Sequence, residues 1–137
     1  MKKEKKLKTK SIAKPKKTYV PPSLTKEDKK KQIKSIKEQT IRPKVKSFES
    51  KRSTHTKKFE EKYGYKISNL SRIAKEIISK KGIDEVMAKG KAAYFTSGSR
   101  PNQTPTSWAL ARLASVITGG AARQVDMKIW KKYKRSN

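Results

Sequence analysis

The sequence predicts a mainly α-helical protein, with about three to five short helices in a small bundle and a long, basic, largely disordered N-terminal arm. Three observations lead to this prediction. Apolar residues in the second half recur at helical spacing, capping residues flank these stretches, and the first half holds too few apolar residues to form a core.

Charge and apolar residues divide the 137-residue chain into two unequal parts. Residues 1–58 hold 22 Lys/Arg, 5 Asp/Glu and 12 hydrophobic residues. Residues 59–137 hold 16 Lys/Arg, 6 Asp/Glu and 32 hydrophobic residues. Because the first part buries too little apolar surface to offset its chain entropy, it is expected to be disordered or extended. We place the boundary near Thr54, which predicts an arm over residues 1–53 and a helical domain with a short basic tail over residues 54–137.

One helix is expected within the arm. Thr25 followed by Asp28 resembles an N-terminal capping arrangement and predicts a helix over residues 26–39, which Arg42-Pro43 stops. This helix carries only two isoleucines as an apolar stripe and is cationic nearly all round. We therefore expect it to form only on a partner.

Two helices are expected in the first part of the domain. Residues 54–63 form one, closed by Gly64. Ser68 caps the next and Gly82 closes it. Its buried face is predicted by apolar residues at i, i+3, i+4, i+7 and i+8, which are Leu70, Ile73, Ala74, Ile77 and Ile78.

A short helical turn and a polar loop are expected next. Asp84 caps the turn, which ends at Gly90, and residues 92–95 form a short apolar stretch for which an extended conformation is one option. The loop leads to Thr104-Pro105, a strong helix start with the hydroxyl as N-cap and proline at the first helical position.

Two further helices complete the domain. The one that begins at Pro105 ends at Gly119-Gly120 and has a core face of Leu110, Leu113, Ala114 and Ile117. The last runs from about Ala121 to Tyr133 and is expected to present Val125, Ile129, Trp130 and Tyr133 to the core.

Composition excludes several classes of function. The chain has no cysteine, which excludes disulfides and thiolate metal sites, and its single histidine, His55, cannot by itself form a metal centre or a paired nucleophile. The carboxylates follow no recognisable metal-binding spacing. We therefore expect no enzymatic activity, no metal and no cofactor.

The charge indicates the partner. The 38 Lys/Arg against 11 Asp/Glu give a net charge of +27, which attracts dense arrays of phosphates. No apolar run approaches the ~18 residues of a membrane span, and the lysine-rich start lacks the apolar stretch of a secretory signal. We expect a protein that is neither secreted nor transmembrane and that binds nucleic acid, without a membrane or small-molecule partner.

The segment from Ser97 to Pro105 is polar, contains two prolines, and ends at a helix N-terminus, where backbone N–H groups favour an anion. Arg100 can pair with a phosphate through two hydrogen bonds. One interpretation is a phosphate pocket between Ser97 and Ser107. The other is that these residues shape a stiff loop and cap a helix.

Trp108 and Arg112 lie four residues apart on one helical face. They could stack on a base or brace a backbone. Alternatively, the tryptophan is half-buried under a neighbouring element with the guanidinium across its ring.

The predicted nucleic-acid contacts combine this part of the domain with lysines of the arm. In the domain they are Arg100, Asn102, Gln103, Thr104, Trp108, Arg112 and Arg123. In and next to the arm they are Lys14, Lys16, Lys17, Lys29, Lys30, Lys31, Lys44, Lys46, Lys51, Arg52, Lys57 and Lys58.

Three stretches of the chain resemble an uncharacterised family of small basic proteins of large eukaryotic DNA viruses, the giant-virus and algal-virus relatives. They are YVPPSLTKEDKKKQIKSI (Tyr19–Ile36), RPKVKSFESKRSTHTKKFEEKYG (Arg42–Gly64) and GKAAYFTSGSRPNQTPTSWALARLASVITGGAARQVD (Gly90–Asp126). The resemblance implies a viral protein located in the virion or the infected host cell, in its nucleus or cytoplasm. It implies no activity and no catalytic residues.

Three functions therefore stay open. The first is DNA binding in genome packaging or organisation. The second is a minor virion protein whose arm bridges acidic capsid surfaces. The third is association with RNA or ribosomes. The second function needs apolar anchors in the arm, for which the candidates are Tyr19, Val20, Leu24, Ile41, Val45 and Phe48.

Overall fold

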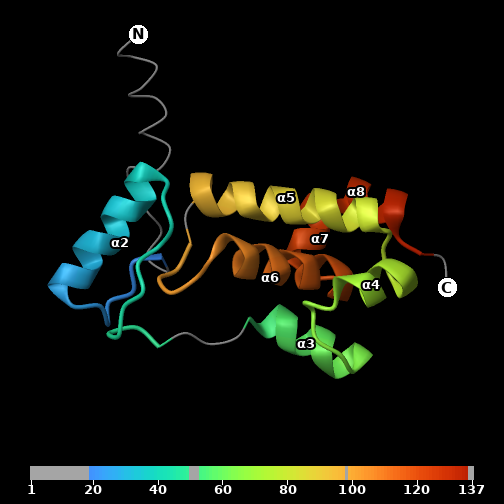
Figure 1. Ribbon diagram of the computed structural model, residues 1–137, viewed down its shortest axis with the longest axis horizontal. Helices are drawn as coiled ribbons and strands as arrows, with labels where there is room; N and C mark the ends of the chain where they lie inside the picture. The colour runs from blue at the N-terminus through green and yellow to red at the C-terminus, as the bar shows by residue number, and fades with distance from the viewer. Residues whose placement is uncertain (1–18, 50–52, 98, 136–137) are drawn as a thin grey trace, which may run out of the picture. The chain divides into compact units, whose positions relative to one another are not determined.

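The computed structural model describes residues 19–49, 53–97 and 99–135, and over these residues the protein is mainly helical (Figure 1). No β-strand occurs among the described residues, where Ile78 and Lys134 form an isolated bridge. The helices are α2 (Lys26–Glu38), α3 (Thr54–Tyr63), α4 (Leu70–Glu76), α5 (Lys80–Ser97), α6 (Pro105–Thr118), α7 (Ala121–Val125) and α8 (Met127–Tyr133). The predicted fold class is confirmed.

The chain forms two compact units. Unit 1 contains the N-terminal part up to residue 50 together with Ala92–Pro105, and unit 2 contains Lys51–Lys91 together with Thr106–Asn137. The sequence places a boundary near Thr54, close to the first of these junctions. It does not predict that a segment from the middle of the helical domain joins the N-terminal part.

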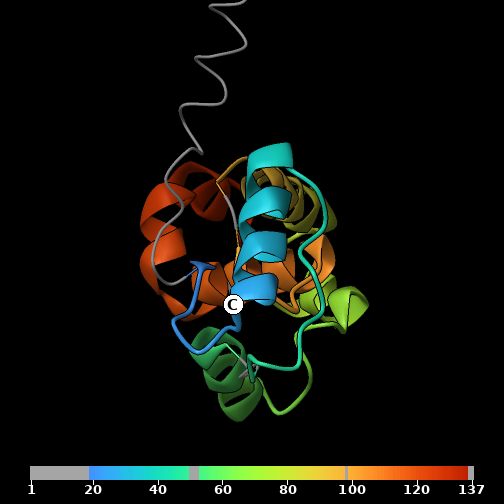
Figure 2. The same cartoon turned by 90° about the vertical axis from the view of Figure 1, so that its left-hand side faces the viewer.

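Unit 1 is organised around α2, which begins as predicted with the Thr25 hydroxyl accepting from the Asp28 N–H at 3.2 Å. The segment that follows α2 runs back beside it (Figures 1 and 2), and the Ser47 hydroxyl donates to Asp28 Oδ2 at 2.6 Å. Ile36 is 1 % exposed. α2 thus has packing and hydrogen bonds within its own unit, and the expectation that it forms only on a partner stays a prediction.

Unit 2 has a continuous apolar core. Phe59 from α3, Ile73 from α4 and Leu113 from α6 are all fully buried. The other core residues are Ile67, Ile77, Ile78, Ile83, Val86, Met87, Ala109, Ala114, Val116 and Ile117. Six of the apolar positions that helical spacing predicts belong to this set, because burying one face is what holds a short helix in place. Six more are partly buried against it: Leu70, Ala74, Leu110, Ile129, Trp130 and Tyr133.

Several helix boundaries differ from the prediction, around α4 and along α5. α4 begins at Leu70 with Asn69 rather than Ser68 as its N-cap, and the Asn69 side chain accepts from the Arg72 N–H. α5 then runs without interruption through Gly82 and Gly90, where the sequence predicts ends, and residues 92–95 are helical rather than extended.

The glycines of α5 are needed for close packing instead. A Cβ at Gly90 would lie 2.7 Å from the Cα of Ala109 on α6, and one at Gly82 would lie 2.5 Å from the Cβ of Tyr133 on α8. Because real Cβ atoms do not approach so closely, only glycine allows the helices to meet at these points.

The predicted last helix is divided in two at Asp126, whose backbone φ of −101° ends α7 before α8 begins. The break changes which residues face the core. Val125 is 69 % exposed, contrary to prediction, whereas Ile129, Trp130 and Tyr133 are partly buried against the core as predicted.

Candidate nucleic-acid interface

Asn102 in the polar loop is held inside unit 1. Its Oδ1 accepts from the Val45 N–H at 2.6 Å, and its Nδ2 donates to the Phe48 carbonyl at 2.9 Å. Its backbone is left-handed, with φ of 67°, a conformation that asparagine tolerates better than most residues. These bonds tie the loop to the segment after α2. The assignment of Asn102 as a phosphate donor stays a prediction, and the bonds give it an internal role.

Tyr94, near the end of α5, also connects the polar loop to the segment after α2. Its hydroxyl accepts from the Arg42 N–H at 2.7 Å and donates to the Gln103 carbonyl at 2.8 Å. Tyr94 is fully buried. Gln103 thus contributes its backbone to the fold of unit 1.

Arg42 is a buried cation that sequence reasoning missed. Its side chain donates to the Ser35 carbonyl at 2.8 Å and to the Tyr94 carbonyl at 2.6 Å, and it lies 4.8 Å from the centre of the Tyr94 ring. Burial lowers the pKa of Arg42 below its ordinary value, but a guanidinium stays charged at neutral pH. Because its acceptors are backbone carbonyls, no spacing of residue types in the sequence could have indicated them.

Gln32 is a second internal residue that the sequence did not indicate. It is fully buried on α2, and its Nε2 donates to the carbonyls of Tyr19 at 2.7 Å and Ser99 at 2.6 Å. The Ser99 hydroxyl in turn donates to the Arg100 carbonyl at 3.2 Å. The side chain of Arg100 is exposed, as is Thr104. The phosphate pocket between Ser97 and Ser107 stays a prediction.

Arg112 in unit 2 is paired with a buried carboxylate. Its Nε and Nη2 donate to the two oxygens of Asp126 at 2.8 and 2.9 Å, and Lys89 Nζ lies 3.2 Å from Oδ1. Burial by itself would raise the pKa of Asp126, but the hydrogen bonds and charges of Arg112 and Lys89 hold it below its usual value. The hydrogen bond to Asp126 raises the pKa of Arg112.

Arg123 also has an internal role, at the C-terminus of α6. It donates to the carbonyls of Val116 at 2.8 Å and Ile117 at 2.7 Å, and its guanidinium lies 4.3 Å from the centre of the Trp130 ring. An arginine at this place satisfies carbonyls that the helix leaves without partners. Trp108 is half-buried. The predicted nucleic-acid contacts of Arg112, Arg123 and Trp108 stay predictions.

The predicted lysines lie at the surface where the structure describes them. Lys29 is half-buried and the others are exposed: Lys30 and Lys31 on α2, Lys44 and Lys46 after it, and Lys57 and Lys58 on α3. Lys14, Lys16, Lys17, Lys51 and Arg52 lie outside the described residues.

Exposed lysines greatly outnumber the ion pairs. In the described part of the chain the salt bridges join Arg72 to Glu76, Lys80 to Asp84, and the Asp126 carboxylate to its two cations. None of the exposed lysines predicted as contacts takes part in these pairs. They are available to an external polyanion.

The described residues contain no group of three or more metal-ligating side chains, and none of their helices is both long and apolar enough to cross a membrane.

Comparison with known proteins gives one match. The model of a family of unknown function, DUF5824, matches residues 18–132. No curated protein and no solved structure matches the chain.

Proposed function

We propose that this chain, which belongs to the DUF5824 family of unknown function, is a nucleic-acid-binding protein that neutralises phosphate charge. The observation that carries the proposal is the net charge of +27 combined with the exposure of lysines that have no carboxylate partner among residues 19–49, 53–97 and 99–135. A surface of this kind gains free energy by releasing the counterions of a nucleic acid.

The proposed binding does not depend on base sequence. A lysine ammonium is a flexible point charge that suits phosphate but carries no base code. The side chains best suited to reading bases are arginine and asparagine. Asn102, Arg112 and Arg123 already have bonds inside their own units, which favours backbone contact by the lysines.

The setting we propose is the genome of a large DNA virus, during its packaging or organisation. The support is the resemblance of three sequence blocks to small basic proteins of such viruses. DNA is therefore the favoured partner, and the virion or the infected cell the favoured location. Binding to RNA is the alternative that the experiment below separates.

The competing function, an arm that bridges acidic capsid proteins, has less support from the structure. It requires apolar anchors that are free to enter pockets on another protein. Leu24 and Val45 are only 4 % and 8 % exposed, and Tyr19, Val20 and Phe48 are half-buried. Of the six candidate anchors, Ile41 is the exposed one, at 61 %.

The test is the salt dependence of binding by the full chain. We expect its affinity for random-sequence duplex DNA to fall by about three to five decades between about 50 and 200 mM salt, the loss for about 6–10 phosphate contacts. Fluorescence anisotropy measures this, with duplex RNA and poly-glutamate as parallel probes. Equal affinity at about 50 and 300 mM salt contradicts the proposal.

Ile41→Ser is the matched control, because Ile41 is exposed and removing it leaves the buried residues in place. DNA affinity should not change in this variant. A loss of poly-glutamate or capsid-protein binding in the same variant, with weak binding of wild type to DNA, would instead support the bridging function.

A further inference from the structure

We infer that the outward face of α2 is the surface on which unit 1 holds the phosphate backbone of a duplex nucleic acid. The inference rests on the proposed function and adds to it the element, the contacting side chains and the form of the nucleic acid.

Four lysines lie along this face, at i, i+4, i+8 and i+11, and we call them the lysine ridge: Lys26, Lys30, Lys34 and Lys37. With 3.6 residues per turn these positions fall within about a quarter of the helix circumference, with Lys34 at one edge, and a rise of 1.5 Å per residue spreads them over about 16 Å. All four side chains are exposed, whereas Gln32, Ser35 and Ile36 on the other side are buried.

The four lysines of the ridge outnumber the two glutamates beside them on α2, Glu27 and Glu38. In the part of the chain that the structure describes, no ion pair involves these lysines, although Glu38 lies four residues after Lys34. Lys80 on α5, by contrast, is paired with Asp84. The ridge therefore presents a concentrated positive field to its surroundings.

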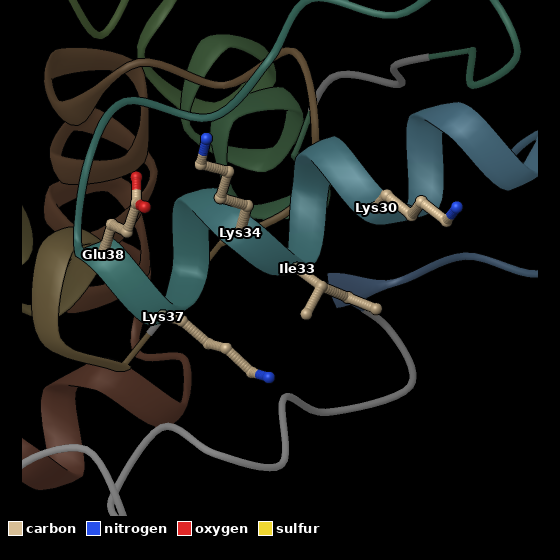
Figure 3. Close-up of a pocket in the computed structure, with 5 residues that line it drawn as sticks. All are labelled: Lys30, Ile33, Lys34, Lys37 and Glu38. Carbon is tan, nitrogen blue, oxygen red and sulfur yellow. The ribbon is translucent and has the colours of Figure 1, made fainter.

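The ridge includes an open depression of about 290 Å³, lined by Lys30, Ile33, Lys34, Lys37 and Glu38. Figure 3 shows Lys30, Ile33 and Lys37 projecting from one side of α2, and Lys34 and Glu38 from an adjacent side. The depression is too small and open for a small-molecule site. Ile33, which is half-buried, provides an apolar spot among the ammonium groups that fits the hydrocarbon face of a sugar.

The composition of α2 favours a duplex over a single strand. Proteins that bind single strands usually stack the bases on aromatic side chains. The thirteen residues of α2, KEDKKKQIKSIKE, include no aromatic residue. The lysines of α2 offer positive charge instead. This suits the phosphate backbone of a duplex, in which the bases are already stacked and paired.

The ridge is also held in place before any ligand arrives. Gln32 donates to two carbonyls, Ser47 donates to Asp28, and Arg42 donates to the Ser35 carbonyl. These contacts order α2 within unit 1, so binding does not have to supply the free energy of helix formation. This distinguishes the ridge from lysines on a flexible tail.

The test compares two triple variants of the full chain. Lys30→Gln/Lys34→Gln/Lys37→Gln removes three charges from the ridge, and Lys66→Gln/Lys75→Gln/Lys81→Gln removes three exposed charges from unit 2 at positions that are not predicted contacts. Affinity for duplex DNA is measured from about 50 to 300 mM salt. Circular dichroism shows whether each variant remains folded.

We expect the ridge variant to bind about tenfold or more weakly at low salt and to lower the slope of log affinity against log salt by about 2.7, or 0.9 per lost contact. The unit 2 variant should change the slope less. Ile33→Ser should weaken binding about fourfold without changing the slope, if binding buries about one methylene's worth of the isoleucine side chain.

The possible failures are distinguishable. If wild type does not bind duplex DNA or RNA at all, the proposed function itself is wrong. If wild type binds and both triple variants lower the slope of log affinity against log salt equally, the ridge is not the binding surface. Tighter binding of single strands than of duplex in the same salt overturns the choice of ligand.

Discussion

Asp126 is a buried acidic residue of unit 2 whose charge depends on its hydrogen-bond partners. Its carboxylate is fully buried and receives two hydrogen bonds from Arg112 and one from Lys89. The side chain of Arg112 is 20 % exposed, so removal of the carboxylate leaves a largely buried guanidinium without its partner. Breaking such a pair from one side is costly, although the intact pair adds little net stability.

We expect Asp126→Asn to lower the free energy of unfolding by about 3 kcal/mol, because it keeps the size of the side chain and loses its charge. Urea denaturation followed by circular dichroism measures this. Glu76→Gln is the matched control, since its pair with Arg72 is about half exposed and should be worth less than about 1 kcal/mol.

The same residue predicts a pH dependence. The pKa of Asp126 is lowered in the folded state, so the folded protein binds fewer protons than the unfolded chain near the unfolded pKa of about 3.9. The stability that Asp126 provides is therefore present above about pH 4 and is lost as the pH falls through the lower folded pKa. Asp126→Asn should lose less stability than wild type between about pH 5 and pH 2.

At the scale of elements, two helices of unit 2 approach each other closely where Gly90 of α5 meets Ala109 of α6. Ala109 is fully buried, and the space beside it leaves no room for a Cβ at position 90. Intrinsic propensity alone would make alanine better than glycine here by about 1 kcal/mol. Packing therefore decides the residue at this position.

Gly90→Ala should destabilise the protein by about 1–3 kcal/mol, because overpacking outweighs the gain in helix propensity. Thermal unfolding measures the change. Ala88→Leu adds a larger group at an exposed position of the same helix and should change stability by less than about 0.5 kcal/mol. An increase in melting temperature for Gly90→Ala would show that α5 and α6 do not approach as closely as described.

At the scale of the whole molecule, charge dominates. A net charge of +27 on 137 residues repels itself in the folded state, and salt screens this repulsion. Binding to a polyanion removes the same repulsion and adds stability that grows with the logarithm of the ligand concentration relative to the Kd. Salt should therefore act in opposite directions on the free and the bound protein.

Differential scanning fluorimetry tests this with and without duplex DNA. We expect the melting temperature of the free protein to rise by a few degrees from about 20 to 300 mM salt, and the increase that DNA produces to shrink over the same range. Potassium glutamate in place of chloride controls for specific anion binding. A DNA-induced increase that persists at high salt contradicts a mechanism based on charge.

The sequence by itself determined the fold class, the helices α2, α3 and α6, and the polyanion hypothesis. These depend on local properties: caps such as Thr25 and Pro105, apolar residues at helical spacing, and the count of charges. The exposed lysines of the candidate interface were predictable for the same reason, because a lysine without a partner is normally at the surface.

Tertiary structure alone decided the continuity of α5, the break at Asp126 and the discontinuous composition of unit 1. It also gave Asn102, Arg112 and Arg123 internal partners. Most of these features depend on groups far apart in the sequence, such as the Tyr94 carbonyl that accepts from Arg42. Arg123 instead meets carbonyls six and seven residues before it, which its position after the turn that ends α6 brings within reach. Residue type shows that a donor exists, but the packing of distant segments determines which acceptor it meets.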